Sequence, residues 1–149
     1  MSIFNNKLQG RQENQGNENK QTIMIVDDEK CQLHAMESLL SGDYHIITAS
    51  CGREALDIIT GMKNPEIIGI IISDQRMPGL TGVELLLKLK DILPNAIRLI
   101  LTGYDTDVDA EAAKAAKIFQ IISKPFDING LQNTIKLAIE EFERWKQKN

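Results

Sequence analysis

Short apolar runs alternate along the chain with longer segments whose apolar residues recur every three or four positions. The short runs are rich in Ile and Val, which is typical of strands buried in a sheet. The longer segments have the spacing of one apolar helix face. The predicted strands are residues 22–26, 44–49, 70–74, 97–101 and 119–122. The predicted helices are residues 31–40, 52–60, 83–93, 107–116 and 128 to about 146.

Strands that alternate with helices predict an α/β fold, in which a doubly wound sheet of five parallel strands carries five helices on its two faces. The chain of 149 residues is long enough for one domain with a full core. Residues 1–20 depart from the pattern, because they are poor in apolar residues and rich in Asn, Gln and Gly. We therefore predict a flexible polar tail over 1–20, a globular domain over 21–140 and an extension of the last helix over 141–149.

Composition and charge argue against several function classes. Hydrophobic residues make up 42% of the chain and charged residues 26%, as in an ordinary soluble protein. No apolar run approaches the roughly 18 residues of a membrane span, and no secretory signal is visible. The net charge of −4 disfavours direct nucleic-acid binding. Cys31 and Cys51 are too few for a disulfide framework, so reduced thiols and a cytoplasmic location are expected.

Polar side chains follow four of the five predicted strands. Asp27 and Asp28 come after the first strand, Asp74 ends the third, Thr102 follows the fourth and Lys124 follows the fifth. Taken alone, Asp74 is equally consistent with an aspartate that caps a turn. The carboxyl ends of parallel strands share one edge of a sheet, however, so we expect these side chains to converge there.

Three adjacent carboxylates repel one another and need a counter-charge. Hard oxygen ligands of this kind suit Mg²⁺, and the absence of His or Cys among them disfavours zinc. A carboxylate left free could accept a phosphoryl group covalently. Mg²⁺, the Lys124 ammonium and the Thr102 hydroxyl could then neutralise the phosphoryl oxygens.

The same residues lie in four motifs whose order and separation are specific. The motifs are Val26-Asp27-Asp28-Glu29, then Ser73-Asp74 with Met77-Pro78-Gly79 and Gly82, then Leu101-Thr102-Gly103-Tyr104, and finally Lys124-Pro125. This set resembles the receiver domain of response regulators in two-component signalling, over residues 21 to about 140. The Leu-Thr-Gly-Tyr and Arg-Met-Pro-Gly variants are similar to a subgroup that is often joined to separate output domains.

The resemblance implies a flavodoxin-like sheet of strand order 2-1-3-4-5 and a role for each site residue. Asp74 would accept phosphate from a histidine kinase or a phosphotransfer protein. Asp28, Asp74 and the backbone carbonyl of Arg76 would ligate Mg²⁺, while Asp27 would hold metal-bound water.

The resemblance also implies roles for the fourth and fifth strands. Thr102 would move toward the phosphate, and Lys124 would pair with the phosphate. The Lys124–Pro125 peptide bond is expected to be cis. The family usually has an aromatic residue three positions before the lysine, and here that position is Ile121. We therefore expect Tyr104, or the fourth helix, to report the phosphorylated state in place of that aromatic residue.

These features predict a phosphorylation-operated switch that controls a partner or output domain and is not a turnover enzyme. One alternative is a Mg²⁺-dependent phosphohydrolase with an aspartyl nucleophile. Such enzymes usually carry a second Asp two residues after the nucleophile, where this chain has Arg76. Another is a flavodoxin-like cofactor carrier, but the acidic residues after the first strand would repel a phosphate.

The last predicted helix carries a heptad-like apolar stripe. Its members are Leu131, Ile135, Ala138, Phe142 and Trp145. The first half of this stripe should pack on the sheet. We expect Phe142 and Trp145 to extend past the domain, where they could form a homodimer seam, a partner site or a helical linker.

Overall fold

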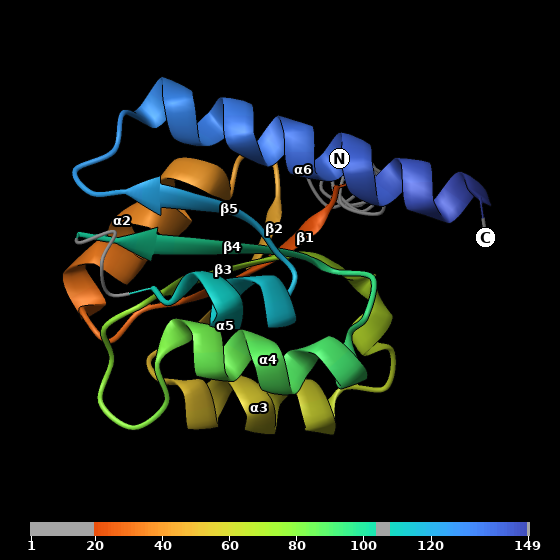
Figure 1. The fold of residues 1–149 in the computed structure, drawn as a ribbon. Helices are drawn as coiled ribbons and strands as arrows, with labels where there is room; N and C mark the ends of the chain where they lie inside the picture. The colour runs from red at the N-terminus through yellow and green to blue at the C-terminus, as the bar shows by residue number, and fades with distance from the viewer. Residues whose placement is uncertain (1–19, 104–107, 149) are drawn as a thin grey trace, which may run out of the picture.

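In the computed structural model, which describes residues 20–103 and 108–148, a five-stranded parallel sheet lies between two layers of helices (Figure 1). The spatial order is β2-β1-β3-β4-β5, so the predicted fold class and strand order are confirmed. The strands are β1 (Thr22–Val26), β2 (His45–Ala49), β3 (Ile68–Asp74), β4 (Ile97–Thr102) and β5 (Ile118–Ser123).

The helices divide into two groups that each bury an apolar core against the sheet (Figure 1). On one face lie α2 (Lys30–Leu40) and α6 (Ile128–Lys148); on the other lie α3 (Gly52–Gly61), α4 (Gly82–Ile92) and α5 (Ala110–Ala115). A short 3₁₀ turn, η1 (Pro65–Ile67), precedes β3 and was not predicted. None of the helices within the described ranges is both long enough and apolar enough to cross a membrane.

The central strands are buried along their whole length. Every residue of β1 and of β3 is buried, because both strands have a strand on each side and a helical layer on each face. This explains why their sequences read as continuous apolar runs without alternation. Asp27, which follows β1, and Asp74, which ends β3, are therefore held by two tightly packed strands.

Helix α5 is shorter than the predicted helix 107–116. Its first turn begins after Asp109, whose side chain accepts a hydrogen bond from the Ala112 N–H at 3.1 Å. This is the geometry of an N-cap, which fixes where the helix starts. None of the six residues of α5 is buried, because its Ala-rich sequence offers little apolar surface to the sheet.

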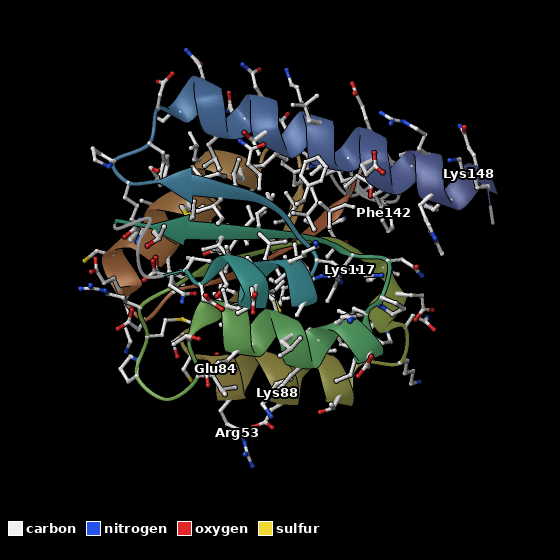
Figure 2. The ribbon with its side chains drawn as sticks, viewed as in Figure 1. Arg53, Glu84, Lys88, Lys117, Phe142 and Lys148 are labelled. Atoms are coloured by element: carbon white, nitrogen blue, oxygen red, sulfur yellow. The ribbon has the colours of Figure 1, made fainter. Side chains whose placement is uncertain are left out.

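The expectation that Phe142 extends past the domain is wrong. Phe142 is 5% exposed, and its ring points from α6 toward the sheet (Figure 2). It packs over Gly69 in β3, where an added Cβ would lie 3.2 Å from two ring carbons. A side chain at position 69 would occupy the space that the ring fills. Trp145, one turn later, is 39% exposed.

Helix α4 begins at a capping box. The Thr81 N–H donates to Glu84 Oε1 at 2.9 Å, and the Glu84 N–H donates to Thr81 Oγ1 at 3.2 Å. These bonds satisfy two donors that a helix start leaves open. The hydrogen bonds from Thr81 also lower the pKa of the Glu84 carboxyl.

The connection from β3 to α4 is held close to the site by Gln75 and Gly82. Gln75 is buried, and its side-chain oxygen accepts from the Val83 N–H at 3.0 Å while its backbone carbonyl accepts from the Gly82 N–H at 3.0 Å. A Cβ on Gly82 would lie 2.4 Å from the backbone oxygen of Asp74 and 2.8 Å from Ile100 Cδ1. Only glycine therefore fits where α4 meets the end of β3.

We expect Gly82→Ala to lower the free energy of unfolding by about 1–3 kcal/mol, the usual cost of overpacking, because the backbone around Asp74 must move. Urea denaturation would measure the change. Gly42→Ala is the matched control, since a Cβ there meets nothing within 4 Å. Equal stabilities of the two variants would contradict the close approach of α4 to β3.

Candidate functional site

Three aspartates meet at the carboxyl edge of the sheet. Ligand atoms of Asp27, Asp28 and Asp74 all lie within 4.8 Å of one another. Parallel pairing of β1 with β3 sets Val26 opposite Ser73, so the residues that follow each strand emerge side by side. Asp27 and Asp74 are 1% and 7% exposed, whereas Asp28 is exposed to solvent.

Asp27 is the most deeply buried of the three aspartates. Its Oδ1 accepts a hydrogen bond from the Glu29 N–H at 2.9 Å, while its buried Oδ2 has no hydrogen-bond partner among the described residues. Burial raises the pKa of Asp27, and the negative charge of Asp74 adds to this effect. The Glu29 hydrogen bond and the charge of Lys124 lower the pKa, but burial dominates.

Lys124 brings a positive charge to the same edge. Its Nζ lies 2.7 Å from Asp74 Oδ1 and 3.4 Å from Gln32 Oε1. The Lys124 N–H donates to the Thr102 carbonyl at 2.8 Å, so the ends of β4 and β5 are tied together. The Lys124–Pro125 bond is cis, as the resemblance implied.

The donor set fits a divalent cation. Three carboxylates beside one ammonium leave an excess of negative charge, and one buried carboxylate oxygen lacks a partner in the described chain. Oxygen ligands without nitrogen or sulfur are the preference of Mg²⁺. Asp27, Asp28 and Asp74 are the residues that could hold such an ion.

Other predicted residues lie around this cluster. Thr102 ends β4 at 1% exposure and pairs with Ser123 at the end of β5. Arg76 is exposed in the connection after β3, and the ligand role of its carbonyl stays a prediction. Ile121 lies in the edge strand β5 with 36% exposure. Tyr104 lies outside the described residues.

Two glutamines near the site were not predicted. Gln32, in the first turn of α2, is a second acceptor for Lys124. Its position four residues after Asp28 could have indicated it, because a helix starting there turns this side chain back over the strand ends. Gln75 orders the connection after Asp74 through its buried side chain, and nothing in the sequence distinguishes it from an exposed loop glutamine.

Comparison with known proteins gives a consistent result. The family model described as the response regulator receiver domain matches residues 23–136. The hydrogenase transcriptional regulatory protein HoxA of Cupriavidus necator is 34% identical over 120 residues, which are 80% of this chain and 24% of that protein. The chain thus spans about a quarter of the length of the first curated relatives it matches.

Solved structures agree with this match. A response regulator receiver domain protein from Clostridium thermocellum has a TM-score of 0.74 and 32% identity, covering 86% of this chain and 98% of that one. The response regulator TrrA from Thermotoga maritima, in complex with Mg²⁺ and BeF, has a TM-score of 0.67 and 26% identity, covering 79% and 98%.

The raised pKa of Asp27 makes a prediction for the metal-free protein. Because its folded-state pKa lies above the unfolded value, ionisation of Asp27 costs stability as pH rises above about 4. We expect Asp27→Asn to raise the free energy of unfolding at neutral pH by about 1 kcal/mol, as when strain at a functional site is relieved. The gain should shrink as pH falls toward about 4.

Denaturant unfolding at neutral and acidic pH, in the presence of a chelator, measures this difference. Asp57→Asn is the control, because the Asp57 side chain is 70% exposed on α3 and lies 3.7 Å from the Arg53 guanidinium. A stabilisation of Asp27→Asn that does not depend on pH would contradict the assigned cause.

Proposed function

The chain belongs to the family of response-regulator receiver domains, and from this premise we propose that it is a phosphorylation-operated signalling switch with Asp74 as phosphoacceptor. The observation that carries the proposal is the position of Lys124 Nζ, 2.7 Å from Asp74 Oδ1, beside two further aspartates. An ammonium at this distance can pair with a phosphoryl oxygen once Asp74 is modified.

In the proposed step, a carboxylate oxygen of Asp74 attacks the phosphorus of a phosphohistidine on a histidine kinase or phosphotransfer protein. The O–P bond forms as the P–N bond breaks, and the imidazole leaves with the electron pair and takes a proton from water. Lys124 pairs with one phosphoryl oxygen, and the Thr102 hydroxyl donates to another.

Mg²⁺, when bound, would supply positive charge to the phosphoryl oxygens. Asp28, Asp74 and the carbonyl of Arg76 are the proposed direct ligands, and Asp27 would orient water on the ion. The buried Oδ2 of Asp27, which has no hydrogen-bond partner among the described residues, supports this assignment. The similar TrrA structure is a complex with Mg²⁺ and BeF, which supports Mg²⁺ as the ion.

The conformational output is proposed to run from Thr102 through Tyr104 to α5. Ile121 occupies the position where the family usually has an aromatic residue, so the usual ring cannot report the state. Helix α5 buries none of its own residues, which means that little packing opposes its displacement.

The proposed partners are a histidine kinase or phosphotransfer protein upstream and an effector or output domain downstream. Relatives such as HoxA are named as transcriptional regulatory proteins, which favours an output that acts on transcription. We also propose a cytoplasmic location, and α6 as the element through which a homodimer could form. The role is that of a switch that modifies only itself; steady hydrolysis of small phosphate esters would instead favour the phosphohydrolase alternative.

We expect acetyl phosphate with Mg²⁺ to add one phosphoryl group to the chain and Asp74→Asn to abolish this addition, because Asp74 is the carboxylate that Lys124 contacts. Intact-mass spectrometry measures the addition, and a chelator should prevent it. Asp57→Asn, at an exposed position of α3, is the matched control and should be modified like the wild type. Labelling that survives Asp74→Asn refutes the phosphoacceptor assignment.

We expect Tyr104→Ala to reduce the change in hydrogen exchange of α5 that phosphorylation or BeF₃⁻ produces, while leaving phosphorylation itself intact. Tyr44→Phe, distant in sequence and packed beside α2, is the control. If α5 responds equally in all three proteins, Tyr104 does not transmit the state, whereas the role of Asp74 is unaffected.

A further inference from the structure

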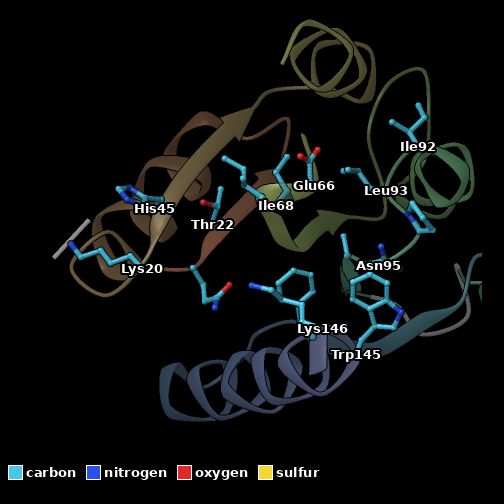
Figure 3. A pocket seen from close by; sticks show the side chains of 15 residues that line it. Lys20, Thr22, His45, Glu66, Ile68, Ile92, Leu93, Asn95, Trp145 and Lys146 are labelled. Carbon is cyan, nitrogen blue, oxygen red and sulfur yellow. The ribbon is translucent and has the colours of Figure 1, made fainter. Parts of the chain in front are cut away.

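An apolar groove lies at the opposite edge of the sheet from the three aspartates (Figure 3). This cavity of about 820 Å³ is bounded by the first residues of β1, β2 and β3, by the connection between α4 and β4, and by the last turns of α6. Nearly buried apolar side chains line its inner part, namely Ile68, Leu93, Ala96 and Phe142.

Large apolar side chains also remain exposed around the groove. Ile67 is 52% exposed, Ile92 is 41% exposed and Trp145 is 39% exposed. A second cavity of about 660 Å³ adjoins the first and shares Trp145 and the segment 94–96 with it. Trp145 therefore lines both hollows, and in the first it is joined by the exposed Ile67 and Ile92.

The chain itself carries a segment suited to this surface. Lys20 lines the groove, so residues 1–19 join the described chain at its rim. The apolar residues of this segment are confined to its start, where Ile3, Phe4 and Leu8 occur, and no hydrophobic residue lies between Leu8 and Thr22. A short apolar stretch is thus followed in the sequence by a polar segment, and the described chain begins at the rim of the groove with Lys20.

The length of that linker matches a return to the groove. Leu8 precedes Lys20 by twelve residues, and a polar, Gly-containing linker of that length has a root-mean-square span of about 19 Å. Phe4 and Leu8 are four residues apart, so one helical turn would present both on the same side. Because the linker is short, the effective concentration of the segment at the groove is in the millimolar range.

We propose that Ile3, Phe4 and Leu8 dock intramolecularly in this groove and cover Trp145. A second copy of the chain would offer the same residues, but at a concentration far below the intramolecular one. The docking would occupy the part of α6 that could otherwise contact a partner. The inference does not depend on phosphorylation of Asp74, because it concerns the other edge of the sheet.

Trp145 is the only tryptophan of the chain, so its fluorescence reports on the groove directly. The experiment compares the unaltered 149-residue chain with the double variant Phe4→Ser/Leu8→Ser and with the control Asn5→Ser/Gln9→Ser. We expect the apolar double variant to shift Trp145 emission to longer wavelength and to increase quenching by acrylamide. The control should match the wild type, and circular dichroism should show the same fold in all three.

Dilution separates the possible occupants. If the segment docks within its own chain, the difference between wild type and Phe4→Ser/Leu8→Ser is the same at every protein concentration. A difference that disappears on dilution, together with a dimer in sedimentation, would assign the groove to a second copy and overturn the proposal. Identical emission and quenching in all three proteins would also overturn it.

Discussion

The repulsion among Asp27, Asp28 and Asp74, countered by one ammonium, is the constraint on which the rest of this structure depends. Ligand oxygens of the three carboxylates lie within 4.8 Å of one another, and burial together with the charge of Asp74 raises the pKa of Asp27. Lys124 compensates part of the charge at 2.7 Å from Asp74. The remaining negative charge is a cost to the metal-free fold, and it is the property that makes the edge receptive to a cation.

Holding such a cluster together requires a platform that does not relax. The fully buried β1 and β3 supply this platform. Gln75 and Gly82 hold the start of α4 against the end of β3, beside the cluster.

Helix α5 is held less firmly than these strands. Its start depends on the side-chain cap of Asp109, whereas its end is tied to the sheet by the buried Arg98. Arg98 is 4% exposed, and its guanidinium donates to the Ala116 carbonyl at 2.9 Å and to the Leu93 carbonyl at 3.0 Å. The start of α5, which is the end nearer to Thr102 along the chain, is therefore less restrained than its end.

The family resemblance implied the strand order, and the sequence pattern predicted the convergence of Asp27, Asp28, Asp74 and Lys124, because parallel strands necessarily bring their carboxyl ends to one edge. It failed where the outcome depended on a distant partner. Phe142 was expected beyond the domain because helix periodicity cannot reveal that Gly69, 73 positions earlier, leaves room for its ring. Gln32 binds Lys124, 92 positions away along the chain, and Gln75 binds the nearby Val83 N–H in a connection whose conformation the sequence pattern does not reveal.

The acidic edge of the sheet and the groove at the opposite edge are coupled mainly through the packing of the elements between them. Residues 68 and 74 of β3 are separated by roughly 20 Å, given about 3.3 Å per residue in a parallel strand. The direct Coulomb interaction of a charge at Asp74 with the groove is weakened by this distance, although salt screens it less through the buried strand than it would through solvent. A connection would have to pass along β3, or along α6, which packs on that strand through Phe142. β3 is buried along its whole length, whereas α6 buries only five of its 21 residues, so a displacement at the acidic edge would reach the apolar groove mainly through the close-packed β3.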